Sequence, residues 1–434
     1  MNFKPKLTSE FIIYLALFGA ARLMAAFWLT PNYSEFTSFH YPFAQLSDYG
    51  LYPFVHFWQE YPPLFPYLSV GVYRALGLIW TPGQLGHYEA YELVMQGLMS
   101  LADLVNAALI YLLVARGAGE KRGAFAGIAF LFSFTAVFVS SGFFDGLVLC
   151  FMLYSLWSFL EDRPVGAGIA LGLGVVTKLV PVAILPALIK FRKDNSQLKQ
   201  LLGGFGVTAA LLWGSFFLVN YELAVMPVRA NGARPGWETV WALIEGQYQF
   251  GFLGPEKMAD LPLFPEPAIK ASEKLKFFAG GADERMLKVR VLSRFSPDIS
   301  SFPQTQMRSL YMITGLIFAV LFVVTWAKIP GQGGDRVIPY AGFLFVLLLL
   351  YSKGWSPQFV IFPAAFILLL YPSALGAAAL LALLFINFLE MPVWLYYVRG
   401  TSLGSVFLGV VVFMRTAFFC LLGWLLFKRC SADA

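Results

Sequence analysis

The feature that most constrains this chain is its series of long apolar runs without charge, of which residues 337–350 are one example. A helix of about 20 mostly apolar residues can cross a bilayer, and shorter ones are tolerated inside a bundle. Hydrophobic residues make up 59% of the 434 residues and charged residues only 13%, whereas a soluble domain carries roughly 25% charged residues. So few charges cannot cover a water-facing surface. The sequence therefore predicts an all-α polytopic membrane protein.

The apolar runs predict a bundle of about twelve transmembrane helices. The short pieces within 164–191 and 357–390 could each merge with a neighbour, and the piece 64–80 is ambiguous because it follows two prolines and contains Arg74. The predicted spans are 10–30, 92–115, 123–141, 144–161, 164–178, 180–191, 201–221, 309–327, 337–352, 357–371, 374–390 and 403–427.

Basic residues in the short loops orient the bundle. They lie at the N-terminus and in the loops 116–122, 192–199, 328–336 and 428–429. Cytoplasmic loops are enriched in Lys and Arg, and all of these loops share one side only if 64–80 stays in or on the outer leaflet. We therefore expect an integral, multi-pass protein of a bacterial or archaeal plasma membrane, with both termini in the cytoplasm.

This topology divides the chain into three parts. An N-terminal transmembrane module, 1–221, carries a first outer loop at 31–91 with interfacial helices. An extracytoplasmic loop follows at 222–308, and C-terminal transmembrane helices occupy 309–434. The net charge of +6 sits mostly in short loops, which suits topology signalling rather than nucleic-acid binding. The partners expected from composition are membrane lipids.

Several charged residues lie at membrane depth, where a charge is costly and usually functional. They are Arg22, Asp103, Asp145, Lys178 and Arg415. The alternative is that each pairs with a neighbour and only holds helices together, which we favour for Asp103 and Arg415. Asp145 and Lys178 instead flank the outer face, where most of the other polar residues at membrane depth also fall.

The first outer loop is dense in polar side chains, among them Glu35, His40, His56 and Glu60. The two histidines and a carboxylate could in principle hold a metal ion, but their spacing fits no ligand motif. No cofactor is therefore expected with certainty, and a divalent cation stays open.

Four motifs, in this order, resemble the GT-C superfamily of membrane glycosyltransferases. The resemblance is strongest to the polyprenyl-phosphate-mannose-dependent mannosyltransferases, meaning glycosyltransferase family 87 and the PIG-M-like enzymes. The last motif resembles that family's lysine-x-x-Ser-Pro-Gln-aromatic signature. The motifs are GLYPF with EYPPL at 50–54 and 60–64, FFDGL at 143–147, ALG through TKLVP at 170–181, and SKGWSPQF at 352–359.

The resemblance implies a GT-C-like bundle that moves a sugar, mannose in the first place, from a polyprenyl-phosphate donor to a lipid or glycan acceptor. The family usually places an acidic residue, typically an aspartate, early in the first outer loop as catalytic base. This chain departs from that pattern, because the only carboxylate at the equivalent place is Glu35. The implied site comprises Glu35 as base with Asp145 and Glu60 in reserve, Lys178, Lys353 and Arg22 on the donor phosphate, and Ser356, Gln358, Tyr61, His56 and His40 on substrate.

Two other functions fit the sequence. A transporter or flippase of lipid-linked sugars would also have many spans and buried charges, although it would often show two similar halves, and none are evident here. A GT-C-like scaffold that binds a glycolipid without catalysis would explain the missing aspartate.

Overall fold

The structure is a computed structural model that describes residues 6–28, 34–133, 139, 141–248, 266–276, 284–300, 302–331 and 334–431. Within those ranges the chain is helical, and β-pairing is confined to isolated bridges. Seven helical segments of the described chain are long and apolar enough to cross a membrane. The predicted all-α polytopic membrane architecture is therefore confirmed.

Each predicted span meets a helix, but the helices fall into two length classes. The seven long segments are α1 (Ser9–Trp28), α4 (Leu85–Ala118), α10 (Asn195–Ala209) with α11 (Ser215–Val219), α17 (Arg308–Lys328), α18 (Val337–Tyr351), α20 (Ala374–Phe388) with its continuation, and α21 (Gly404–Ser431). The shorter ones are α5 (Glu120–Leu131), α7 (Asp145–Leu160), α8 (Pro164–Thr177), α9 (Leu185–Lys190) and α19 (Ile361–Leu370). Part of the span expected at 123–141 lies outside the described residues.

The short helices end where proline or packing interrupts them. Helix α8 stops at Thr177, because Lys178 has extended backbone and Pro181 follows in the next turn. Every residue of α19 is buried. Broken helices are tolerated at membrane depth when protein surrounds them, so the central helices of the bundle can be shorter than the bilayer is thick.

The outer helices instead expose apolar side chains. On α17, Met312 is 75% exposed and Leu316 67% exposed, and Val323 follows the same pattern. An exposed apolar surface on this scale is rare on soluble monomers. Helix α17 therefore faces lipid.

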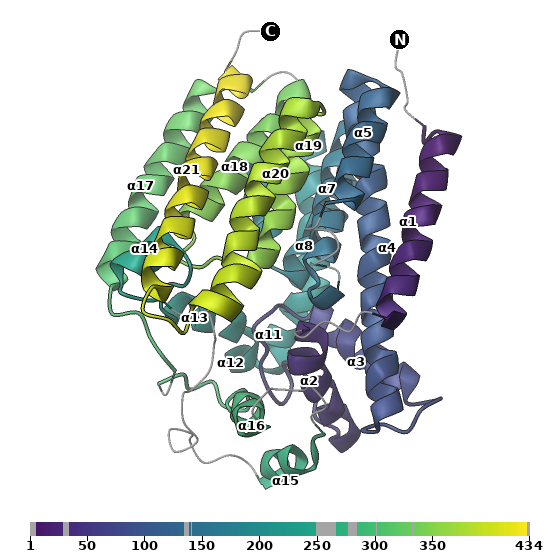
Figure 1. Cartoon of the computed structure of the whole chain (residues 1–434), viewed down its shortest axis with the longest axis vertical. Coiled ribbons are helices and arrows are strands. Elements are labelled where there is room, and N and C mark those ends of the chain that lie inside the picture. The colour runs from purple at the N-terminus through teal and green to yellow at the C-terminus, as the bar shows by residue number, and fades with distance from the viewer. Residues whose placement is uncertain are drawn as a thin grey trace.

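Figure 1 shows the long helices running side by side, with both termini at one end of the bundle and a further set of short helices gathered at the other. Placing the termini at the same end agrees with the even number of crossings expected from the sequence. The assignment of that end to the cytoplasm stays a prediction from the distribution of basic residues.

The short helices at the other end form a cap over the bundle. It contains α2 (Tyr41–Gln45), α3 (Leu64–Leu76), α12 (Tyr221–Ala224), α13 (Met226–Ala233), α15 (Glu266–Lys274) and α16 (Glu284–Leu292). Helix α3 has 13 residues, or about 20 Å at 1.5 Å per residue, which is too short to span. This agrees with our expectation that 64–80 does not cross.

The two long outer loops pack against each other within this cap. The Trp58 amide donates to the Arg294 carbonyl at 2.9 Å, and the Gln45 side chain donates to the Lys276 carbonyl at 2.7 Å. An apolar cluster also joins the loops, with Phe43 from the first and Leu275 from the second. The segments 31–91 and 222–308 thus make one structural unit in their described parts, while the predicted domain boundaries stay a prediction.

Candidate active site

The centre of the candidate site is a buried ion pair between two helix ends. Asp145 is the first residue of α7, and Lys178 directly follows the last residue of α8. The Lys178 ammonium donates to the Asp145 Oδ1 at 2.7 Å, and the two side chains are 9% and 0% exposed. The second Asp145 oxygen, Oδ2, has no hydrogen-bond partner. The pair therefore fixes the position of the Lys178 side chain between the ends of α7 and α8.

Three aromatic rings surround the Lys178 ammonium. Its Nζ lies 4.4 Å from the ring centre of Phe359 and 5.3 Å from those of Tyr61 and Phe144. Such contacts stabilise a cation, more so where water is excluded. Tyr61, Phe144 and Phe359 come from the first, second and fourth motifs, and Lys178 from the third. The four motifs, up to 300 residues apart in sequence, thus meet at one lysine.

Glu35 lies beside this cluster. It precedes the π-helical turn Phe36–His40, which Ser34 stabilises by accepting from the Phe36 amide at 3.2 Å. The Tyr61 hydroxyl donates to Glu35 Oε2 at 3.4 Å. Burial raises the pKa of Glu35 to about 7, although the nearby Lys178 charge opposes that rise. A carboxylate with such a pKa can take up a proton near neutral pH, as a general base must.

His40 lies buried against the same rings. Its ring centre is 4.7 Å from Phe65 and 5.7 Å from Phe144, and its Nε2 has no hydrogen-bond partner. Burial, helped by the charges of Arg290 and Lys178, holds the pKa of His40 well below its ordinary value. The imidazole is therefore neutral, with a ring nitrogen that a substrate hydroxyl could bond.

Glu60 is occupied by arginines of the second outer loop. The Arg294 Nη2 lies 2.5 Å and the Arg290 Nη2 3.6 Å from Glu60 Oε1. Arg294 is fully buried and stacks on Trp58, with its guanidinium carbon 4.1 Å from the ring centre. Glu60 therefore pairs with the guanidinium groups of Arg290 and Arg294 and keeps them close to each other.

Arg234, at the end of α13, belongs to the same electrostatic group. Burial is the main cause that lowers the pKa of Arg234, and the positive charge of Arg290 also lowers it. The charges of Glu60 and Tyr61 oppose this and raise the pKa. Its guanidinium carbon lies 3.7 Å from the ring centre of Trp237. Our sequence interpretation missed all three arginines. Arg290 and Arg294 lie in a charged stretch of the sequence, 266–294, which by itself does not indicate what it packs against, and Arg234 lies outside that stretch and outside the four motifs.

Residues of the fourth motif make two separate sets of contacts. The Lys353 ammonium donates to the carbonyls of Gly232 at 2.8 Å and Arg234 at 2.5 Å. Burial, with the charge of Arg234, lowers the pKa of Lys353 to about 8. Lys353 thus holds the end of α13 in place, while Phe359 is the part of the motif that contacts Lys178.

Two polar residues of the same motif, Ser356 and Gln358, lie between Lys353 and Phe359 in the sequence. The Trp237 indole donates to the Ser356 hydroxyl at 3.2 Å. Gln358 is buried, and its Oε1 has no hydrogen-bond partner. Gln358 therefore keeps an acceptor available beside Phe359.

Other expected site residues lie apart from this cluster. Arg22 pairs with Asp103 at 3.6 Å between α1 and α4, and Arg415 pairs with Glu390. For Asp103 and Arg415 the structure thus supports the interpretation as helix-pairing charges. His56 accepts from the Tyr52 amide at 3.0 Å in an exposed turn. Within the described ranges, no group of three or more His, Cys, Asp or Glu residues is placed to hold a metal ion.

The sequence profile of glycosyltransferase family 87 matches residues 75–227. No curated protein sequence matches the chain. Among solved structures, the apo oligosaccharyltransferase of Archaeoglobus fulgidus has a TM-score of 0.43 at 13% identity, covering 98% of this chain and 56% of that one. The same archaeal enzyme, AglB, in complex with an inhibitory peptide and a dolichol-phosphate has a TM-score of 0.42 at 11% identity, with 98% and 57% covered.

ArnT from Cupriavidus metallidurans in the apo state has a TM-score of 0.39 at 16% identity, covering 97% of this chain and 78% of that one. The chain spans little more than half of the length of the archaeal oligosaccharyltransferase. The family match includes the motifs around Asp145 and Lys178. It confirms the resemblance to glycosyltransferase family 87 over that part of the chain.

Proposed function

We propose that this enzyme transfers a sugar from a polyprenyl-phosphate donor to a lipid or glycan acceptor, at the capped end of the bundle. The observation that carries the proposal is the meeting of a partly buried carboxylate with a pKa near neutral, Glu35, and a buried lysine, Lys178, within one set of aromatic rings. This arrangement offers a base and a cation within one group of aromatic side chains.

Glu35 is the proposed base. It takes the proton of the acceptor hydroxyl as the oxygen attacks the anomeric carbon, and the bond from that carbon to the phosphate oxygen breaks. The polyprenyl phosphate leaves with the electron pair, so one displacement inverts the anomeric centre. A positioned base contributes typically about 10²- to 10⁴-fold to such a step. Asp145, engaged with Lys178, is less available for this task.

Cationic groups are the proposed partners of the donor phosphate. A leaving phosphate is stabilised by fixed positive charge in a site of low dielectric. Lys178 carries three donors, and its bond to Asp145 uses one of them. Arg290 extends the positive charge from the cap side, since its charge acts on both Glu35 and His40. Arg22 pairs with Asp103 apart from this cluster, so we place it behind Lys178 and Arg290 as a partner of the phosphate.

The sugar is the proposed ligand of the neutral polar groups. His40 Nε2 and Gln358 Oε1 are buried without hydrogen-bond partners, and both lie next to rings that contact Lys178. Buried polar groups usually find a partner, and sugar hydroxyls would supply it. Tyr61 offers both a ring face and a hydroxyl. Mannose is proposed as the sugar on the family resemblance alone.

The experiment is a transfer assay with the full chain purified into lipid. Synthetic polyprenyl-phosphate donors carrying radiolabelled mannose, glucose or galactose are supplied with a membrane-lipid acceptor fraction. We expect labelled product and release of polyprenyl phosphate, with mannose preferred. Labelled donor that crosses liposome membranes intact would instead indicate a flippase. Donor that binds but is neither moved nor consumed would indicate a non-catalytic glycolipid-binding scaffold.

A further inference from the structure

A cavity lies at the end of the bundle opposite to the cap, among the helix ends on the side of the two termini. Its volume is about 1110 Å³. It is bounded by the C-terminal ends of α4, α7, α19 and α21 and the start of α5. Figure 1 places these ends far from the cap. The cavity therefore has no direct part in the proposed sugar transfer.

Basic side chains dominate the charged lining of this cavity. Among the described residues of the lining, the basic ones are Arg116, Arg122, Arg192, Lys193 and Arg429, and the acidic one is Asp335. Arg116 pairs with Glu161, and Lys193 pairs with Asp162 at 2.8 Å. Even after these two pairings, three arginines contribute positive charge to the cavity.

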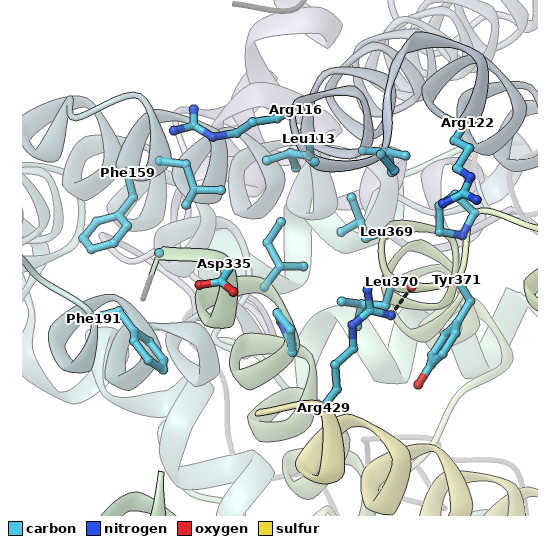
Figure 2. Close-up of a pocket in the computed structure, with 18 of the residues that line it drawn as sticks. Leu113, Arg116, Arg122, Phe159, Phe191, Asp335, Leu369, Leu370, Tyr371 and Arg429 are labelled. Carbon is cyan, nitrogen blue, oxygen red and sulfur yellow. Dashed lines mark hydrogen bonds between the residues drawn. The ribbon is translucent and has the colours of Figure 1, made fainter. Parts of the chain in front are cut away.

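Two of those arginines reach the cavity from different helices, α5 and α21. Figure 2 shows Arg122 and Arg429 coming from opposite sides of the cavity. Arg122 is exposed at the start of α5, and Arg429 donates to the Leu370 carbonyl at the end of α19. A planar guanidinium carries five donors and suits phosphate oxygens. Arg429 thus keeps donors beyond the one that it gives to Leu370.

The inner wall of the cavity is apolar. Leu113, Phe159, Ile338 and Leu369 contribute to it, and Figure 2 shows Leu113 and Leu369 between the basic side chains. A free phosphate ion gains nothing from such a wall, whereas a lipid matches it with an acyl chain. Basic pockets between transmembrane helices commonly take anionic lipid head groups. The ends of the spans also lie where head groups are found.

We propose that this cavity binds the phosphate head group of an anionic membrane lipid, held by Arg122 and Arg429, with an acyl chain on the apolar wall. A soluble phosphate ion carries the same phosphate group as the lipid head group and could also bind these two arginines. The proposal does not rest on sugar transfer.

The test measures lipid binding to the full chain in a neutral detergent by native mass spectrometry. The probes are phosphatidylglycerol and phosphatidylcholine. Wild type should retain phosphatidylglycerol in preference to phosphatidylcholine. Arg122→Gln combined with Arg429→Gln should bind phosphatidylglycerol about thirtyfold more weakly, since each basic residue near a charged head group contributes a factor of about five.

Two further variants keep the test decisive. Arg122→Gln alone changes an exposed side chain, so it should fold normally and still lose about fivefold. Lys121→Gln is the matched control, because Lys121 is the exposed neighbour of Arg122 and does not line the cavity; it should bind like wild type.

The outcomes separate the sources of the phosphate. Equal binding of phosphatidylglycerol by wild type and both arginine variants would overturn the site. An equal loss in Lys121→Gln would also overturn it, since the effect would then be general charge. Inorganic phosphate is tested alone by thermal shift. If it stabilises wild type but not the double variant, while the lipid shows no preference, the lipid assignment is overturned.

Discussion

Raising the pH from 6 to 8 should increase kcat/KM for sugar transfer about tenfold if Glu35 is the base. Burial raises the pKa of Glu35 to about 7, and a base works only in its deprotonated form. With that pKa the carboxylate fraction is about 9% at pH 6 and about 91% at pH 8. Activity is therefore lost as the pH falls through 7, a range in which an ordinary glutamate would stay ionised.

Two variants shift this profile in opposite directions. After burial, the next largest influence on the pKa of Glu35 is the Lys178 charge, which lowers it, while the Asp145 charge raises it. Lys178→Gln should therefore move the acid limb to higher pH, and Asp145→Asn should move it to lower pH. The measurement is kcat/KM against pH for each purified variant, with the position of the limb read separately from the size of the activity.

The control for these profiles is Glu273→Gln. Glu273 is an exposed carboxylate on α15, in the same cap, and its removal should leave the limb in place. A rate that does not change between pH 6 and 8 would refute the argument. A shift of both Lys178→Gln and Asp145→Asn in the same direction would also refute it, because the charges would then not act through Glu35.

Two other substitutions test residues that hold the site in place. Glu60→Gln removes one partner of the buried pair with Arg294, so it should destabilise the protein by about 3–5 kcal/mol and lower its thermal unfolding temperature. Gly354→Ala should lower the transfer rate and destabilise the protein by about 1–3 kcal/mol, because a Cβ there would lie 2.0 Å from the Trp237 ring.

Each of these variants has a matched control in the chain. Lys270→Gln breaks an exposed pair with Glu266 on α15 and should change stability by less than about 1 kcal/mol. Gly203→Ala adds a Cβ within α10 that meets nothing within 4 Å, so it should be neutral or stabilising. A loss in either control equal to that in its partner variant would contradict the packing argument.

The bundle could be predicted from the sequence because each span is a local property of about 20 residues. Hydropathy could not indicate how many of the predicted spans are helices too short to cross the whole bilayer. Helix α8 ends at Thr177, because of backbone changes around Lys178 and Pro181. Helix α19 can be short, because every one of its residues is buried among neighbours. Both facts depend on tertiary packing.

The candidate site shows the same division between local and tertiary information. The topology predicted that Asp145 and Lys178 would lie on one face, and the structure joins them at 2.7 Å. Arg290 and Arg294 were missed, because nothing in a loop sequence shows that it folds back onto Glu60 some 230 residues earlier. The motif lysine, Lys353, contacts backbone carbonyls. Its predicted role on the donor phosphate stays a prediction.

The measurement that tests the central claim most directly compares wild type with Glu35→Gln for both donor binding and sugar transfer, in the same lipid preparation. The amide keeps the size of the side chain and its contact with the Tyr61 hydroxyl but cannot accept the proton. We predict unchanged binding of mannosyl polyprenyl phosphate and a loss of about 10²- to 10⁴-fold in transfer. Transfer at the wild-type rate would contradict the assignment of Glu35 as the base.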